Sequence, residues 1–180
     1  MRRNIDRRVT MKQHFGFTLV ELMVVIGIIG IIAVLAVPNF ARIQRQARVR
    51  GACQRTGQHF KQIRERAIST NGNYQITFPN QYTYRLLRPN ATMQDFKLSG
   101  SGGGMVRFGG TGVAGQPPEG NVAAPGVNGI DFPGGFLEID ARGGATSGVL
   151  YITDGIDNYA VGINRLGRIT TYRYSGGTWN

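Results

Sequence analysis

The sequence predicts an α+β protein in which a long N-terminal helix packs on an antiparallel β-sheet head. Residues 17–37 form an unbroken apolar run. Residues 38–70 continue with apolar side chains at spacings of three and four, the pattern of an amphipathic helix. From residue 71 onward, short segments rich in aromatic and β-branched residues alternate with turn residues, which is typical of antiparallel strands.

The apolar run is long enough to cross a lipid bilayer. It has 21 residues, FTLVELMVVIGIIGIIAVLAV, with Glu21 as its only charged residue. At about 1.5 Å per residue, a helix of this length covers a hydrocarbon core of about 30 Å. The alternative is a buried core helix, but such helices are seldom apolar on every side over this length. We therefore expect a transmembrane helix at residues 17–37 and a bend at Pro38, because proline removes one helical hydrogen bond.

The start of this run carries a processing motif. A basic, polar lead (residues 1–16) ends in Gly16, and Phe17 opens the apolar run. A secretory signal peptide would place a small-residue cleavage site after the apolar run, and no such site lies near Val37. The segment Gly16-Phe17-Thr18-Leu19-Val20-Glu21 resembles the prepilin peptidase site of type IV pilins and type II secretion pseudopilins. The resemblance implies a pilin-like fold, cleavage between Gly16 and Phe17, and N-methylation of Phe17 on a retained helix.

Glu21 is unusual because it lies within the apolar run. An ionised carboxylate at membrane depth costs at least about 2.5–3.5 kcal/mol unless it finds a partner. The pilin resemblance implies that the Phe17 amine of a neighbouring subunit is this partner, and that the pair sets the axial register of assembly. The alternative is that Glu21 lies near the membrane interface and stays solvated.

The positive charge is concentrated before the head. The formal net charge is +11: the lead carries +4, Glu21 carries −1, residues 39–70 carry +7 and residues 71–180 carry +1. Basic residues flank the apolar run on both sides, so charge alone does not orient it in the membrane. The resemblance implies a single-pass inner-membrane protein with its lead in the cytoplasm and its head in the periplasm. Translation from Met11 instead of Met1 would leave the shorter lead MKQHFG.

The amphipathic stem helix (residues 38–70) should pack on the head. Its apolar face is expected to comprise Cys53, Thr56, Phe60, Ile63 and Ala67, with Phe40, Ile43 and Ala47 forming a similar stripe nearer the membrane. The turn residues Asn71-Gly72-Asn73 should end the helix. Cys53, the only cysteine, is expected to be a small buried or subunit-facing residue. The basic residues of the stem could bind anionic lipid head groups or nucleic acid, or pair with acidic residues of other subunits.

The head should contain short strands and one long loop. Residues 99–129 are mostly Gly, Pro, Ser, Ala and Asn, and we expect a Gly-rich surface loop there, with Met105–Phe108 as its one pairing segment. Residues 175–180 are expected to be a tail. The expected strands are Tyr74–Phe78, Tyr82–Leu87, Met93–Leu98, Ile130–Phe132, Phe136–Ile139, Val149–Thr153, Tyr159–Asn164 and Arg168–Tyr174.

The sequence offers no catalytic constellation. His14 lies in the lead, and His59 is expected to be a solvated helix residue. Gly100–Gly104 lacks the Lys-Ser/Thr pair of a phosphate-binding loop. Asp154, Asp157 and Asn158 share one turn, but their three oxygens are too few for Ca²⁺ without further ligands. We therefore expect no enzymatic activity, no cofactor and no metal.

The C-terminal part resembles the GspH/FimT group of minor pseudopilins and minor pilins. The resemblance lies in residues 130–135, 159–164 and 165–169. Some FimT-like members bind DNA through a Gly-Arg-x-Arg motif, which implies Arg165, Arg168 and Arg173 as phosphate-contacting residues here. Gly167-Arg168-Ile169-Thr170 lacks the second arginine of that motif. The alternative is that these arginines are solvated, because the head is nearly neutral and nucleic-acid-binding domains usually show a basic patch.

These resemblances imply a minor pseudopilin of a type II protein secretion system, at or near the tip of the periplasmic pseudopilus. The alternative is a FimT-like minor pilin that binds DNA for uptake. In either case the expected partners are other pilin or pseudopilin subunits, the prepilin peptidase and the inner membrane, with DNA as an additional partner in the alternative.

Overall fold

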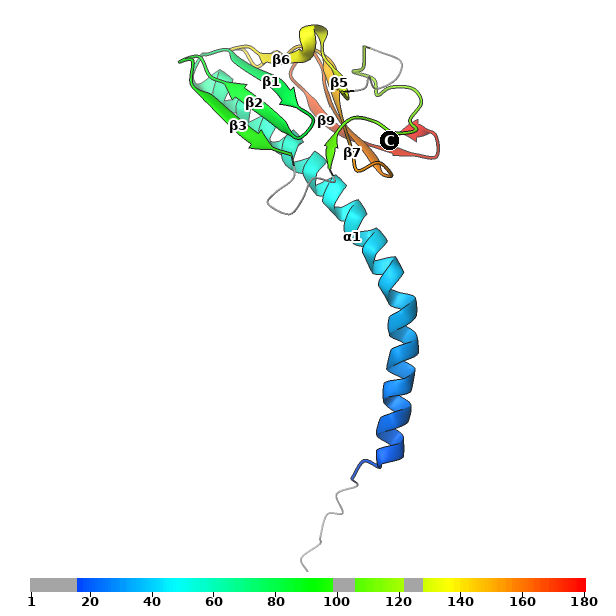
Figure 1. Ribbon diagram of the computed structural model, residues 1–180. Coiled ribbons are helices and arrows are strands. Elements are labelled where there is room, and N and C mark those ends of the chain that lie inside the picture. Colours follow the sequence, from blue (N-terminus) through cyan, green and yellow to red (C-terminus); the bar gives the residue numbers. More distant parts are fainter. Residues whose placement is uncertain (1–15, 99–105, 122–127) are drawn as a thin grey trace, which may run out of the picture. The chain divides into compact units, whose positions relative to one another are not determined.

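The computed structural model describes residues 16–98, 106–121 and 128–180, apart from the side chains of residues 35–38 (Figure 1). The chain divides into two units, Met1–Ala41 and Arg42–Asn180, and helix α1 (Leu19–Ser69) runs through both. The expectations for residues 1–15 and for Gly100–Gly104 lie outside the described residues. The bend at Pro38 and the domain boundaries at residues 16/17 and 37/38 stay predictions.

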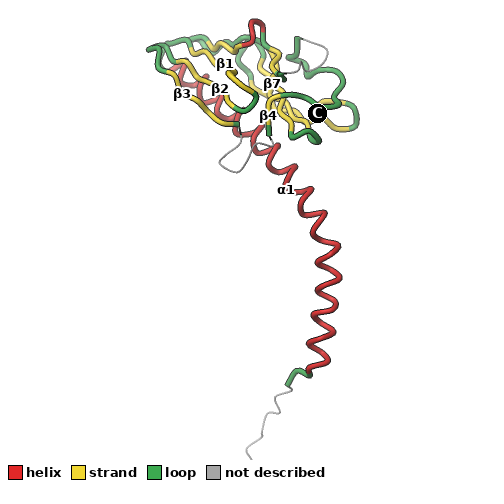
Figure 2. The backbone as a smooth tube through the Cα atoms, in the orientation of Figure 1, coloured by secondary structure: helices red, strands yellow, loops and turns green. Residues whose placement is uncertain are grey.

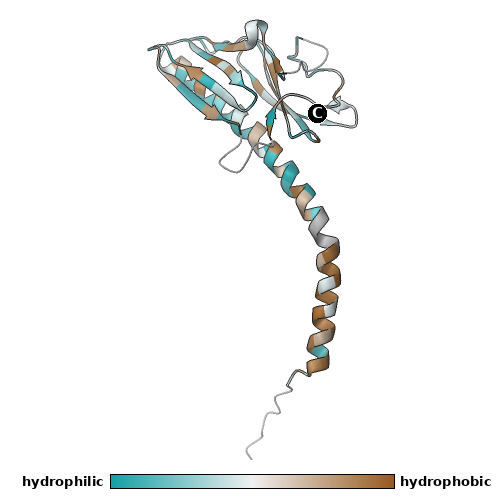
Figure 3. Ribbon diagram, in the orientation of Figure 1, coloured by the Kyte–Doolittle hydropathy of each residue, from teal (hydrophilic) through white to brown (hydrophobic). Residues whose placement is uncertain are grey.

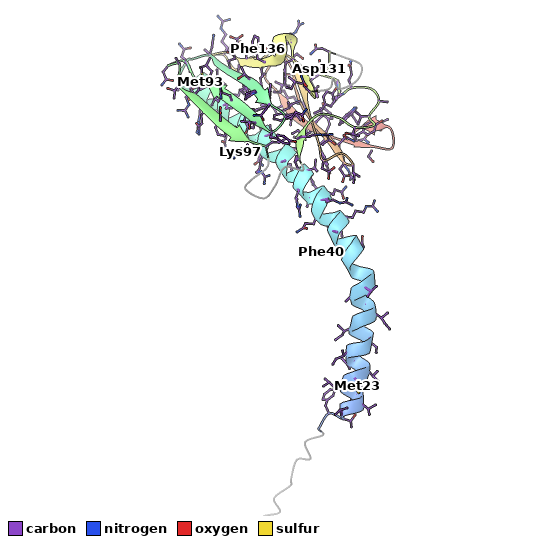
Figure 4. The ribbon with its side chains drawn as sticks, in the orientation of Figure 1. Met23, Phe40, Met93, Lys97, Asp131 and Phe136 are labelled. Carbon is purple, nitrogen blue, oxygen red and sulfur yellow. The ribbon has the colours of Figure 1, made fainter. Side chains whose placement is uncertain are left out.

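The first unit is a helix whose apolar side chains have no partner within the chain. From Leu19 to Val34 every side chain is exposed, and Met23, for example, keeps 66% of its surface accessible (Figures 3 and 4). Among the described residues, no single helix is both long and apolar enough to cross a membrane. The stretches Leu19–Val34 and Asn39–Ser69 meet that criterion only as a bent pair, by length and composition alone.

The C-terminal end of α1 follows from its local sequence. Asn71 adopts a left-handed conformation (φ 47°), which asparagine tolerates better than most residues. The Gly72 N–H donates to the Ala67 carbonyl at 3.1 Å, and the Asn71 N–H donates to the Ile68 carbonyl at 3.3 Å. This pair of bonds is a Schellman motif, which satisfies carbonyls at the helix end. The predicted stop at Asn71-Gly72-Asn73 is therefore confirmed.

The strands of the second unit form two antiparallel sheets (Figure 2). The first has the order β3-β2-β1-β6 and consists of β1 (Tyr74–Asn80), β2 (Thr83–Leu87), β3 (Met93–Lys97) and β6 (Phe136–Ile139). The second has the order β10-β9-β8-β7-β4, with β5 also paired to β7. It consists of β4 (Arg107–Phe108), β5 (Ile130–Asp131), β7 (Gly148–Thr153), β8 (Asn158–Ile163), β9 (Ile169–Ser175) and β10 (Thr178–Trp179). A 3-10 turn (η1, Pro133–Gly135) precedes β6.

The predicted fold class, a helix packed on antiparallel β-structure, is confirmed. The predicted buried face of the stem is also confirmed, since all five of its residues are at most 2% exposed. Phe60 packs edge-on against Tyr84 of the first sheet, and the Cys53 thiol donates to the Ala160 carbonyl of the second sheet at 3.5 Å. One helix face thus contacts both sheets. The sequence pattern missed Val49 and Ala52, which extend this face toward the N-terminal end of the stem.

Gly57 explains how closely the helix approaches the second sheet. A Cβ at this position would lie 3.1 Å from Thr171 Cγ2 on β9, tighter than most such contacts. Glycine here lets the helix backbone lie against the strand, a gain that offsets its low helix propensity.

The expectation that His59 is a solvated helix residue is wrong. Its ring lies 4.1 Å, centroid to centroid, from the ring of Phe96, and its Nδ1 is 2.8 Å from the Tyr84 hydroxyl. Burial, and secondarily the charge of Arg66, lowers the pKa of His59. The helix pattern places His59 beside the buried face, where strands β2 and β3 cover it.

Within the predicted Gly-rich loop of residues 99–129, residues 109–121 belong to no helix or strand and are largely exposed or half-buried, whereas two apolar residues just before them are buried. Val106 and Phe108 are at most 3% exposed, and β4 confirms the predicted pairing near Phe108. The following residues cover a second, smaller apolar cluster on the second sheet, where Trp179 Nε1 donates to the Gly115 carbonyl at 3.3 Å and the Tyr172 hydroxyl donates to Glu119 Oε1 at 3.0 Å. This loop is held by the aromatic side chains of β9 and β10.

The expected tail at residues 175–180 is also wrong. Gly176 and Gly177 both have positive φ and form a two-residue turn, after which β10 pairs with the end of β9. Gly-Gly is one of the few dipeptides that adopt this hairpin geometry without strain. β10 is only two residues long, too short to show an alternating pattern in the sequence.

Cys53 should be inert in the folded protein. Burial raises the pKa of its thiol from 9.0 to about 12, and only the thiolate reacts with alkylating reagents. We expect iodoacetamide at about pH 8 to leave Cys53 unmodified in the native chain and to modify it in about 8 M urea, as read by intact mass. Native labelling at the rate of the unfolded chain would contradict this. The Cys53 thiol of the unfolded chain ionises at a lower pH than the buried thiol of the folded chain. The stabilisation of the folded state from burying the neutral thiol is therefore complete below pH 9.0 and is lost as the pH rises toward about 12.

Candidate processing and binding sites

The predicted cleavage site lies immediately outside the helix. Thr18 is the N-cap: its hydroxyl accepts the Glu21 N–H at 3.2 Å, and its carbonyl accepts the Leu22 N–H at 3.2 Å. Gly16 and Phe17 precede this cap in irregular backbone, and the Phe17 side chain is 79% exposed. The Gly16–Phe17 peptide bond is therefore free of helical hydrogen bonds, the state in which a peptidase can bind and cut it.

Glu21 lies in the first turn of α1, three residues after the cap. Its side chain is exposed in the isolated chain, and it is the only ionisable residue between Leu19 and Val34. A carboxylate at this end of a helix is favoured by the helix dipole. Cleavage before Phe17 would create a positively charged amine four residues before Glu21. The amine and the Glu21 carboxylate would then lie near the same end of the helix.

At the other end of α1, Arg64 joins two loops of the head. Its Nε donates to the Gly143 carbonyl at 2.8 Å, and its Nη2 donates to the Leu166 carbonyl at 3.3 Å. The loop of Gly143 is held by Asp140, whose carboxylate accepts the N–H groups of Arg142 and Gly144. Arg64 therefore holds the loop after β6 against the turn between β8 and β9.

This arrangement brings two of the three predicted DNA-contacting residues together. Arg165 and Arg168 are exposed on the β8–β9 turn, and Asn164 Oδ1 orders that turn by accepting the N–H groups of Leu166 and Arg168. Arg142 is exposed on the adjoining loop. Sequence reasoning missed Arg64 and Arg142 because they lie far along the chain from Arg165 and Arg168. We call the four residues Arg64, Arg142, Arg165 and Arg168 the basic loop surface.

The basic loop surface is not purely cationic. Arg165 lines a hollow of about 460 Å³ together with Glu138 and Asp140. These carboxylates reduce the positive potential around Arg165, since opposite charges within a few ångströms offset each other.

Arg173 is separate from the other two candidates. It lies opposite Tyr159 in the β8–β9 register, and side chains alternate between faces along a strand. Its neighbours Tyr172 and Tyr174 bond to Glu119 and to the Ala114 N–H on the side covered by loop 106–121. Arg173 instead lines a groove between α1 and β9. The structure thus does not bring Arg173 together with Arg168.

The side chains considered for Ca²⁺ are used in local structure. Asp154 Oδ1 accepts the N–H groups of Ile156 and Asp157, at 3.0 and 2.9 Å. Asn158 exchanges two hydrogen bonds with the backbone of Thr111. Within residues 16–98, 106–121 and 128–180, no group of three or more His, Cys, Asp or Glu residues is arranged to hold a metal ion.

Comparison with known protein families identifies the prokaryotic N-terminal methylation motif at residues 11–37. The match covers Gly16, Phe17, Glu21 and the apolar run. Neither the curated proteins nor the solved structures contain a match to this chain. The motif indicates processing by a prepilin peptidase, anchoring in the membrane by the N-terminal helix, and assembly with other pilin subunits. The head lies outside the match, so the motif supports the type IV pilin and pseudopilin superfamily through residues 11–37 alone and selects no subgroup.

Proposed function

We propose that the chain is a minor pseudopilin of a type II protein secretion system, a structural subunit at or near the tip of the periplasmic pseudopilus. The observation that carries this proposal is the exposed apolar helix Leu19–Val34, with one carboxylate, Glu21, placed after an accessible Gly16–Phe17 bond. The role is assembly, and the chain performs no chemistry of its own.

The helix needs an apolar environment from outside the chain. Burying one Val, Leu, Ile or Met side chain is worth about 1.5–3 kcal/mol, and the described part of this helix exposes many of them. Before assembly the inner membrane supplies that environment, with a single pass and the head in the periplasm. After assembly the packed helices of neighbouring subunits replace the lipid.

Glu21 gives this packing a register. In the apolar interior of a filament, an unpaired carboxylate is costly and a paired one is tolerated. The methylated Phe17 amine of a neighbouring subunit supplies the opposite charge in this proposal. Helices would therefore be free to slide until the amine of one reaches Glu21 of the next.

Deleting the gene in the native bacterium tests the proposed function. We expect secreted proteins to accumulate in the periplasm and DNA uptake to stay normal.

Complementation with the wild type should restore secretion. The variant Glu21→Gln, which keeps the shape and removes the charge, should be processed normally but restore at most about a tenth of the wild-type secretion. A matched control is Gln44→Glu, an exposed change on the stem. Normal secretion in the deletion strain would contradict the proposal.

The basic loop surface favours one second candidate, a FimT-like minor pilin that binds DNA for uptake. Arg165 and Arg168 lie on one ordered turn, and Arg142 lies beside them on a loop fixed by Arg64. Exposed guanidinium groups on adjoining turns can contact the phosphates of a duplex. Each phosphate contact contributes affinity that falls with salt.

Duplex DNA titrated against the purified full chain in detergent micelles tests this candidate. We expect Arg165→Ala/Arg168→Ala to abolish measurable binding at about 0.15 M salt, and to lower the slope of log affinity against log salt by about 1.8 for two lost phosphate contacts. Arg173→Ala is the matched control, since it removes one charge from β9 away from this surface. Wild-type affinity in the double variant would exclude the site.

A further inference from the structure

A groove of about 720 Å³ runs between the stem helix and the second sheet. One wall is α1 from Ile43 to Gln54, and the other is the middle of β9, Thr171–Arg173, together with Tyr159 of β8 and Asn180. Its residues come entirely from the unit Arg42–Asn180. At the membrane-proximal end Ile43 keeps 57% of its surface exposed, and Ala47 is also exposed one turn further along the helix. The groove therefore has an apolar floor at one end.

Beside this groove, the edge of β9 at Thr171 has no partner strand among the described residues. Asn180 and Arg173 exchange two backbone hydrogen bonds, of 2.7 and 2.9 Å, which continue the β9–β10 pairing. Alternate residues of an antiparallel strand direct their N–H and C=O groups to the same side. The backbone groups of Thr171 thus point to the same edge as those of Arg173. No described strand pairs with β9 at Thr171 on that side.

The charge of the groove has one sign. Arg50 from α1 and Arg173 from β9 both line it, and none of the described residues that line it is acidic. Both guanidinium groups act on the same phenol: each opposes the rise in the pKa of Tyr159 that burial causes, while Asp157, outside the groove, adds to that rise. Tyr159, Arg50 and Arg173 line the same groove. Arg50 belongs to the stem segment 39–70, whose net charge is +7, so the surrounding helix adds to the positive potential of the groove.

These features together select an occupant. An open edge binds an extended chain by continuing the sheet, and affinity then comes from main-chain hydrogen bonds. Two arginines without a carboxylate favour acidic side chains, and Ile43 offers contact to an apolar residue. We propose that this groove binds an extended acidic segment of a partner protein, which adds a strand to β9 at Thr171 and pairs its carboxylates with Arg50 and Arg173. The inference rests on residues of the unit Arg42–Asn180 alone and is independent of the proposed secretion role.

The test uses the full chain in detergent micelles and a defined probe. The probe is a fluorescein-labelled peptide of about eight residues that alternates Val or Thr with Asp or Glu, and its binding is followed by fluorescence anisotropy. We expect saturable binding that weakens between about 50 and 500 mM NaCl, because salt screens exposed ion pairs. Arg50→Gln and Arg173→Gln should each weaken binding about tenfold. Both side chains are exposed, so the variants should keep the intrinsic fluorescence of Trp179.

Three controls separate this proposal from plain charge attraction. Arg107→Gln, on strand β4 at the far edge of the second sheet, should bind the peptide as the wild type does. A peptide with Asn and Gln in place of Asp and Glu should lose affinity, and so should an acidic peptide with a central proline, which cannot continue a strand. Wild-type affinity in both groove variants, or equal binding of the proline peptide, would overturn the proposal. Peptide-independent self-association that blocks the groove would assign it instead to a second copy, and would likewise overturn it.

Discussion

The apolar surface of α1 is the constraint on which the structure depends. From Val49 to Ala67 one face of the helix is buried by both sheets, so the head is organised around it. From Leu19 to Val34 the helix is apolar on all sides, and nothing in the described part of the chain covers it. At about 25 cal/mol per Å², leaving this second stretch in water is strongly unfavourable. One element thus supplies the core of the head and requires an environment that the head does not provide.

The N-terminal motif lies at the start of the exposed apolar stretch of α1. Thr18 starts the helix after Phe17, so the Gly16–Phe17 bond stays in irregular backbone next to the exposed apolar stretch. Glu21 is close enough to the same end to share its electrostatic environment with a new amine. The helix cap, the predicted cleavage site and the one carboxylate of this stretch therefore lie within six residues, 16–21.

Much of this architecture could be predicted from the sequence because its signals are local. The apolar run, the stem face around Phe60 and the Asn71 stop all depend on spacing that a helix imposes. The sequence could not show that loop 106–121 packs on Trp179, because its few anchoring side chains act through partners more than 50 residues away. The sequence also could not show that His59 packs on Phe96 or that Arg64 joins two loops, because these partners are far apart along the chain. Arg173 was grouped with Arg168 by sequence proximity, whereas strand alternation directs it to the groove beside Arg50.

The intact mass of the mature protein purified from membranes tests the central claim most directly. If the chain is processed as a pilin, the protein should begin at Phe17, and its mass should include one additional methyl group on that amine. The predicted N-terminus would then carry the charge that Glu21 requires in the apolar interior. A mature chain that still begins at Met1 or Met11 would mean that Gly16–Phe17 is not cleaved. The helix would then be a plain anchor, and the account of assembly through Phe17 and Glu21 would be contradicted.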